Sequence, residues 1–175
     1  NDSSIVAPAN ETSHFIFCEW NNVKEFENLF FENIQDLPGV IIEGIQGIGG
    51  IQIPSQELMS KISELCTENS VFFISDEIQS GYARSGKFFA HQYFNVKPDI
   101  ITTAKGMANG FPIGGVLVSP KIPPKHKMLG TTFGGNHLAC AAAIAVLEII
   151  ADENLMEESF QKGAYLIQKL QEIPQ

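Results

Sequence analysis

Short, uninterrupted apolar runs alternate along this chain with segments whose apolar residues recur at helical spacing. Five runs resemble strands, at residues 14–18, 40–43, 71–74, 100–103 and 115–118. Helical patterns cover about 22–35 and a segment that begins at Pro54, where Leu58, Ile62 and Leu65 share one face. Strands that are apolar throughout suit a sheet buried on both sides. The sequence therefore predicts an α/β fold with a mostly parallel central sheet and helices on both faces.

The last forty residues carry two further helical patterns. Residues 136–150 are rich in alanine and apolar nearly all round, which predicts a buried helix. Residues 154–170 are amphipathic, and their candidate core residues are Leu155, Phe160, Leu166 and Leu170. No repeat or linker divides the chain, so we expect residues 1–175 to form one domain. The chain begins without Met and stops close to a helical pattern, so we expect an internal piece of a longer protein.

Charge and cysteine usage narrow the class of partner. The chain has eleven Lys and Arg and twenty Asp and Glu, which gives a net charge of −9. This charge disfavours binding to nucleic acid and to anionic membranes. Small molecules or another protein chain are the expected partners. The three cysteines and the four histidines show no metal-ligand spacing, so no metal is expected. We expect surface or capping roles for the histidines, which are His14, His91, His126 and His137. With no leader and no apolar run of 18 residues, we expect a cytoplasmic protein.

Polar residues follow the predicted strands where they end. Glu43, Asp76, Gln79 and Lys105 occupy these positions, and open α/β sheets bind ligands at the carboxyl ends of their strands. Asp76 follows four apolar residues, so its carboxylate needs a partner. From spacing alone, a structural ion pair with Lys105 or two solvated loop ends explain these residues equally well.

Glycines gather around the same strand ends. Thirteen of the fifteen lie in the segments 44–50, 81–86, 106–115 and 130–135. Such density allows close backbone approach and unusual φ values, as at a site that holds a flat ligand or a phosphate. Structural turns alone are the alternative.

Four motifs in order resemble the class III (ornithine-type) aminotransferases of pyridoxal 5'-phosphate (PLP) fold type I, above all the acetylornithine and succinylornithine enzymes. The motifs are IEGIQGIGG at 42–50, SDEIQSG at 75–81, TTAKG at 102–106 and GTTFGGN at 130–136. The resemblance runs from about residue 14 to the C-terminus. It implies a piece of the PLP-binding large domain, without its N-terminal segment and without the C-terminal small domain.

The resemblance also implies a role for each strand-end residue. Lys105 would hold PLP as a Schiff base and later move the proton, while Asp76 would pair with the pyridinium nitrogen. Gln79 would bind the phenolic oxygen of the cofactor. Thr132 would bind the phosphate of the partner subunit, which implies a homodimer, and Glu43 would lie near the substrate.

The chain departs from the family pattern at two positions and lacks two parts. Gly44 replaces a usual proline, and Ile48 replaces a usual glutamate that in several members pairs with a substrate-binding arginine, so the donor preference is open. The phosphate-gripping segment and the carboxylate-binding arginine of the family lie outside these 175 residues. We therefore expect the isolated fragment to be inactive.

The leading hypothesis is transamination of an ω-amino donor such as N-acetylornithine, with 2-oxoglutarate as acceptor, in arginine biosynthesis. Ornithine, 4-aminobutyrate or a diamine are competing donors, and a PLP mutase or decarboxylase is a more distant one. A non-catalytic fragment or degenerate homologue that serves as an interaction module is the alternative class. A dehydrogenase is disfavoured because no GxGxxG follows a strand.

Overall fold

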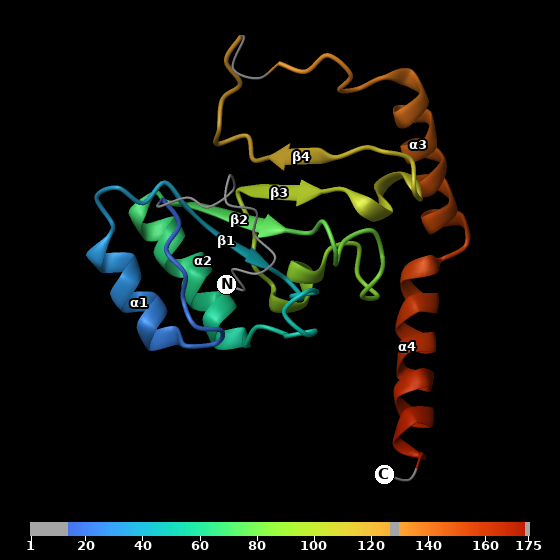
Figure 1. Cartoon of the computed structure of the whole chain (residues 1–175), viewed down its shortest axis with the longest axis horizontal. Helices are drawn as coiled ribbons and strands as arrows, with labels where there is room; N and C mark the ends of the chain where they lie inside the picture. Colours follow the sequence, from blue (N-terminus) through green and yellow to red (C-terminus); the bar gives the residue numbers. More distant parts are fainter. Residues whose placement is uncertain (1–13, 127–129, 174–175) are drawn as a thin grey trace.

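The structure is a computed structural model that describes residues 14–126 and 130–173. Its helices and strands follow one another along the chain as Figure 1 shows. They are α1 (Val23–Glu32), β1 (Gly39–Glu43), α2 (Gln56–Asn69), β2 (Phe72–Asp76), η2 (Ala90–Phe94), β3 (Ile100–Thr103), η3 (Lys105–Ala108), β4 (Gly115–Val118), α3 (His137–Asp152) and α4 (Leu155–Gln171). The elements η2 and η3 are short 3₁₀ helices.

The four strands form one sheet in the order β1-β2-β3-β4. β1, β2 and β3 run parallel, and β4 pairs antiparallel with β3. The predicted mostly parallel sheet is therefore confirmed. The register pairs Glu43 with Asp76 and Asp76 with Thr102, so the three parallel strands end close together at one edge.

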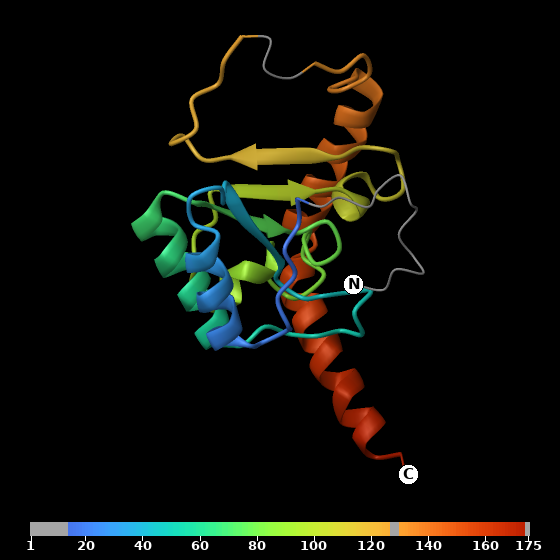
Figure 2. The ribbon, with the colours of Figure 1, turned by 60° about the vertical axis from the view of Figure 1, so that its left-hand side comes forward.

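The core lies between the sheet and helices α1 and α2, which pack side by side (Figures 1 and 2). Leu58, Ile62 and Leu65 on α2 are buried, as their spacing predicts. They meet Phe73 of β2 and Phe30 of α1, each 2% exposed. α2 begins where Ser55 caps it, because the Ser55 hydroxyl oxygen accepts the Leu58 N–H at 3.1 Å.

Replacing Phe30 with alanine is expected to lower the free energy of unfolding by about 3–5 kcal/mol, because a buried ring leaves a cavity in the core. Phe31, its neighbour on α1, is 54% exposed and supplies a matched control. The Phe31→Ala variant is expected to lose less than about 1 kcal/mol. Urea titration of both variants measures the difference, and equal losses would contradict this account of the core.

The N-terminal segment differs from the prediction. Residues 15–19 form no strand, and Phe15, Ile16 and Phe17 are each more than half exposed. The expected strand at 14–18 is wrong in the described structure, because no strand of the sheet pairs with this segment. Its apolar run was the only signal for a strand, and a strand also needs a neighbour to accept its backbone hydrogen bonds.

The two C-terminal helices are far more exposed than their sequences predict. On α3 only Ala139, Ala143 and Ile150 are buried, and α4 has no buried residue. The expectations of a buried helix at 136–150 and of core residues Phe160, Leu166 and Leu170 on α4 are wrong here. An apolar composition predicts that a helix packs against other residues. It does not say whether those residues belong to the described part of the chain.

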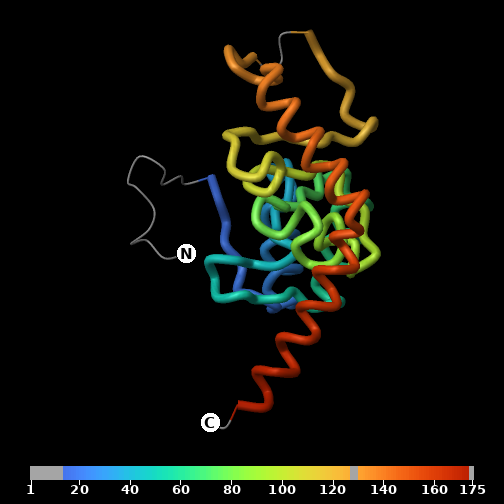
Figure 3. The backbone as a smooth tube through the Cα atoms, turned by 90° about the vertical axis from the view of Figure 1, so that its right-hand side faces the viewer, coloured from blue at the N-terminus to red at the C-terminus, as the bar shows by residue number. Residues whose placement is uncertain are grey.

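Helices α3 and α4 lie on the opposite side of the molecule from α1 and α2 (Figures 1 and 2). α3 packs against η3, and α4 extends away from the sheet, as Figure 3 shows. Ile41 and Phe72, on the sheet face away from α1 and α2, remain 51% and 40% exposed. Within the described residues, no helix is both long enough and apolar enough to cross a bilayer.

Candidate active site

The structure brings Lys105 and Gln79 into contact. Lys105 follows β3 directly, and Gln79 lies in the turn that follows β2. The Lys105 Nζ donates a hydrogen bond to the Gln79 Oε1. Both side chains are exposed, so a ligand can reach the amine. Two of the residues that the sequence singled out, 26 positions apart, therefore meet at the carboxyl edge of the sheet.

The backbone at Lys105 adopts an unusual conformation. Its φ is +38°, which is uncommon for a residue with a side chain. Gly106, the next residue, is closely packed, because an added Cβ would lie 3.0 Å from the Arg84 Nη2 and 3.2 Å from the Tyr82 Cβ. Strained backbone of this kind concentrates at functional sites. The tight turn at 104–106 thus presents the Lys105 amine beside the end of β2.

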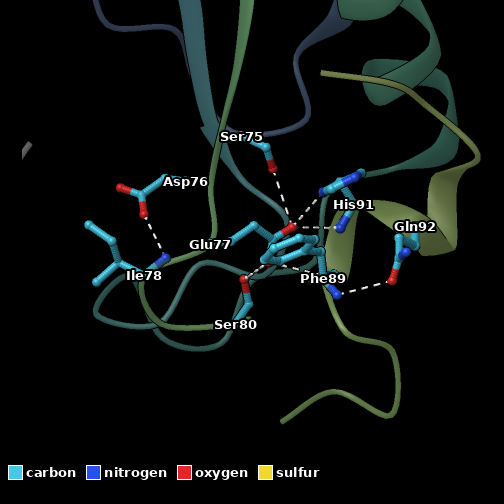
Figure 4. A network of polar contacts seen from close by, with 9 residues as sticks. Ser75, Asp76, Glu77, Ile78, Ser80, Phe89, His91 and Gln92 are labelled. Carbon is cyan, nitrogen blue, oxygen red and sulfur yellow. Dashed lines mark hydrogen bonds and ion pairs between the residues drawn. The ribbon is translucent and has the colours of Figure 1, made fainter. Parts of the chain in front are cut away.

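Asp76 is the last residue of β2 and is half-buried. Its Oδ1 accepts the Ile78 N–H at 3.0 Å, an arrangement that starts the turn after the strand. Among the described residues, its second oxygen accepts no hydrogen bond. Figure 4 shows the Asp76 carboxylate pointing away from the cluster around Glu77. The free oxygen is suited to a cationic N–H of a ligand, such as a protonated ring nitrogen.

The loop after β1 packs against the same site. The Glu43 Oε2 accepts the Gly47 N–H at 3.1 Å, which closes the start of the loop. A Cβ at Gly47 would lie 2.9 Å from the Gln79 Cγ, so the loop backbone supports the glutamine side chain. Gly44, where the family usually has proline, is buried against Ala90. In this chain Glu43 orders the loop, and a contact with substrate stays a prediction.

A buried polar cluster lies beneath the site and centres on Glu77, which is 1% exposed (Figure 4). The Glu77 carboxylate accepts hydrogen bonds from Ser75, Ser80, Ala90 and His91. Burial by itself would raise the pKa of Glu77, but the hydrogen bonds from His91, Ser80 and the backbone hold this pKa below its ordinary value. Glu77 is therefore ionised at neutral pH.

The sequence reasoning missed this cluster. The sequence predicts no role for Glu77 beyond its place in the motif SDEIQSG. The surface or capping role expected for His91 is wrong, because His91 is 6% exposed. A signal was present in the strand periodicity, since successive side chains of a strand point to opposite faces. If Asp76 faces a ligand, the next residue faces the interior, and a carboxylate there requires several donors.

Thr132, to which the resemblance assigns the cofactor phosphate, lies in a different segment of the chain. Thr132 is exposed in the segment 130–136, which precedes α3 beyond β4 (Figures 1 and 3). In that segment the Thr131 Oγ1 accepts the Gly134 N–H at 3.0 Å. Among the described residues, Thr132 shares no hydrogen bond with Lys105, whose partner is Gln79. Within residues 14–126 and 130–173, no group of three or more His, Cys, Asp or Glu side chains is arranged to hold a metal ion.

The open α/β sheet thus carries a lysine amine, an amide and a carboxylate at adjoining strand ends, which are the groups that the resemblance to the class III aminotransferases assigns to PLP. The aminotransferase class-III family profile matches residues 4–175. The chain belongs to the class III aminotransferase family, which confirms the resemblance that the four motifs predict.

Curated relatives and solved structures agree with this assignment. The chain is 42% identical over 129 residues to the acetylornithine aminotransferase of Methanothermobacter thermautotrophicus, covering 71% of this chain and 32% of that protein. It is 46% identical over 130 residues to ornithine aminotransferase 2 of Staphylococcus aureus, with the same coverage. The chain therefore spans about a third of the length of the curated relatives it matches.

Two solved structures share the fold. The ornithine aminotransferase of Toxoplasma gondii, described with PLP partly occupying its active site, superposes with a TM-score of 0.82 at 33% identity, over 91% of this chain and 38% of that one. An (S)-enantioselective ω-transaminase from Thermomicrobium roseum gives a TM-score of 0.78 at 35% identity, over 85% of this chain and 35% of that one.

Proposed function

We propose that the intact protein is a PLP-dependent aminotransferase that transfers an amino group from an ω-amino donor, such as N-acetylornithine, to 2-oxoglutarate. The observation that carries the proposal is the contact between the Lys105 Nζ and the Gln79 Oε1, at the sheet edge where β2 ends with Asp76. These are the groups that a flat, phosphorylated pyridine aldehyde requires: an amine for its carbonyl, a hydrogen-bond partner for its phenolic oxygen and an anion for its ring nitrogen.

Bound PLP supplies an electron-accepting ring that stabilises negative charge on the carbon of the donor. The chain's own residues would hold it and move the proton. Lys105 would bind the cofactor covalently through Nζ and, when released by the donor amine, would carry a proton at that nitrogen. Asp76 would keep the ring nitrogen protonated through its negative charge. Gln79, whose Oε1 faces Lys105, keeps its amide nitrogen as a donor for the phenolic oxygen.

The quaternary part of the proposal is a homodimer in which Thr132 reaches the cofactor phosphate of the partner subunit. Its support is the exposure of Thr132, which leaves its hydroxyl open to a second chain. We further propose that residues 1–175 form part of the PLP-binding large domain and that other segments of a cytoplasmic enzyme complete the site. The three free cysteines, Cys18, Cys66 and Cys140, are consistent with a reducing compartment.

The choice of donor follows the relatives, which are named as acetylornithine and ornithine aminotransferases. Ile48 is 85% exposed in the loop whose neighbouring residue, Gly47, supports Gln79. An isoleucine at this position offers no charge to a donor or to a pairing arginine. Ile48 thus favours a donor whose recognition does not need a glutamate at position 48. A panel of donors can test this preference.

The test is formation of glutamate from 2-oxoglutarate by the PLP-loaded intact protein, measured across a panel of amines. We expect N-acetylornithine to give the highest kcat/KM, followed by ornithine, 4-aminobutyrate and a diamine. A different order of donors would change the proposed donor but would still support the assignment of an aminotransferase. No glutamate with any amine, from protein that has bound PLP, would overturn the proposal and favour a non-catalytic interaction module.

A further inference from the structure

The carboxylate of Glu77 is saturated with donors. Its Oε1 accepts from the Ser75 Oγ at 3.3 Å, the His91 N–H at 2.8 Å and the His91 Nδ1 at 2.9 Å. Its Oε2 accepts from the Ser80 Oγ at 2.6 Å and the Ala90 N–H at 2.9 Å. Because an ionised carboxylate only accepts hydrogen bonds, the Nδ1 of His91 must carry the proton in this pair.

These hydrogen bonds join two segments that lie 13 and 14 residues apart in sequence. One segment is the turn after β2, which contains Glu77 itself and Ser80. The other is the start of η2, at Ala90 and His91. Gly44, after β1, packs on the same point, because an added Cβ would lie 2.8 Å from the Ala90 Cβ and 3.0 Å from the His91 nitrogen. The Glu77 carboxylate thus holds the end of β2 to the start of η2, against which the residue after β1 also packs.

The backbone of Glu77 is held as firmly as its side chain. Its N–H donates to the Thr102 carbonyl at 3.0 Å, which continues the ladder between β2 and β3 past the last residue of β2. Its carbonyl accepts the Gly81 N–H at 2.9 Å, which closes the turn that carries Gln79. Asp76 immediately before Glu77 and Gln79 two residues after it therefore have little freedom to move.

We propose that Glu77 is a positioning residue, whose buried carboxylate holds the turn at 76–80 so that Asp76 and Gln79 are presented to the cofactor beside Lys105. This inference rests on the proposed function, since it assigns Glu77 to the same site. Glu77 itself touches neither Lys105 nor the free oxygen of Asp76 in the structure. Its effect is expected on the affinity for PLP, because misplaced partners weaken every contact of the ligand.

The chemistry of the cluster makes Glu77→Gln a sharp substitution. Both oxygens of Glu77 accept a backbone N–H, one from His91 and one from Ala90. A glutamine has the same size, but whichever way its amide is turned, its NH₂ group faces one of these N–H donors. The turn must then shift to relieve the conflict. The side chain of His91 can be altered in a graded way, because the asparagine amide nitrogen can replace the Nδ1 donor and a leucine cannot.

The experiment measures the dissociation constant for PLP of the intact protein by absorbance titration, alongside the melting temperature without PLP. We expect Glu77→Gln to raise the dissociation constant about tenfold or more, by analogy with residues that orient ligand-binding groups elsewhere. Leu65→Ala, on the buried face of α2, is the matched control for lost stability. It should lower the melting temperature while changing the dissociation constant less than about twofold.

The histidine pair keeps the proposal testable if Glu77→Gln fails to fold. His91→Leu should weaken PLP binding, and His91→Asn should restore it toward the wild-type value. The inference would be overturned if, in every variant including Leu65→Ala, the dissociation constant for PLP rose in proportion to the fall in melting temperature. Glu77 would then contribute to stability alone. Borohydride reduction of the wild type separates the two proposals, because absence of an adduct on Lys105 would refute the proposed function itself.

Discussion

A Lys105→Ala variant of the intact protein is expected to lose the covalent PLP adduct and about 10³-fold or more of its transaminase turnover, because one amine serves as both nucleophile and proton carrier. The structure supports this assignment through position. Lys105 sits in a strained turn at the end of β3, and its Nζ contacts Gln79. Borohydride reduction followed by peptide mass spectrometry locates the modified lysine, and glutamate formation measures turnover.

The control for this variant is Lys97→Ala, which removes an exposed amine from the loop before β3. It should form the adduct and turn over like the wild type, because Lys97 precedes β3 whereas Lys105 follows it, and the two residues lie at opposite ends of the strand. An adduct that persists in Lys105→Ala would move the cofactor site to another lysine. Melting curves of both variants exclude a loss of fold as the cause of the expected difference.

The residues that could be predicted from sequence are those whose environment is local. A run of apolar residues that ends in a carboxylate describes β2 and Asp76 without reference to any other element, and glycine near Lys105 indicates a tight turn. That these residues share one edge also follows, because parallel strands end at the same edge of a sheet. Their direct contact does not: the sequence offers Asp76 as the structural partner of Lys105, whereas the hydrogen bond of Lys105 goes to Gln79. The roles that the family motifs imply for these side chains stay predictions.

What escaped prediction depends on partners distant in sequence. The Glu77 cluster needs Ala90 and His91, and no spacing rule brings η2 under the end of β2. The helix at 136–150 is apolar, but its burial depends on what packs against it, and within the described residues Ala139, Ala143 and Ile150 are the buried ones. Phe15 and its neighbours show the same failure, since an apolar run becomes a strand only beside another strand.

Asp76→Asn is the sharpest test of the electrostatic part of the site. Asparagine has nearly the same shape, and its amide oxygen can still accept the Ile78 N–H that Asp76 Oδ1 accepts at 3.0 Å. The substitution therefore removes the negative charge and spares the turn. We expect turnover to fall by about 10²–10³-fold, which is typical when one preorganised electrostatic partner is removed. The exposed Asp36 on the loop after α1 gives the matched control, Asp36→Asn, with unchanged turnover.

The reason lies in how the charge would act on bound PLP. A carboxylate beside the ring nitrogen favours the protonated, electron-accepting ring, and a neutral amide does not. The Asp76→Asn protein should therefore still form the adduct on Lys105 and still melt near the wild-type temperature, while its turnover falls. Asp76→Glu restores the charge but adds a methylene group, so it should recover only part of the rate. If Asp76→Asn turns over as fast as Asp36→Asn, the free oxygen of Asp76 has no part in the chemistry, and the carboxylate serves only to start the turn after β2.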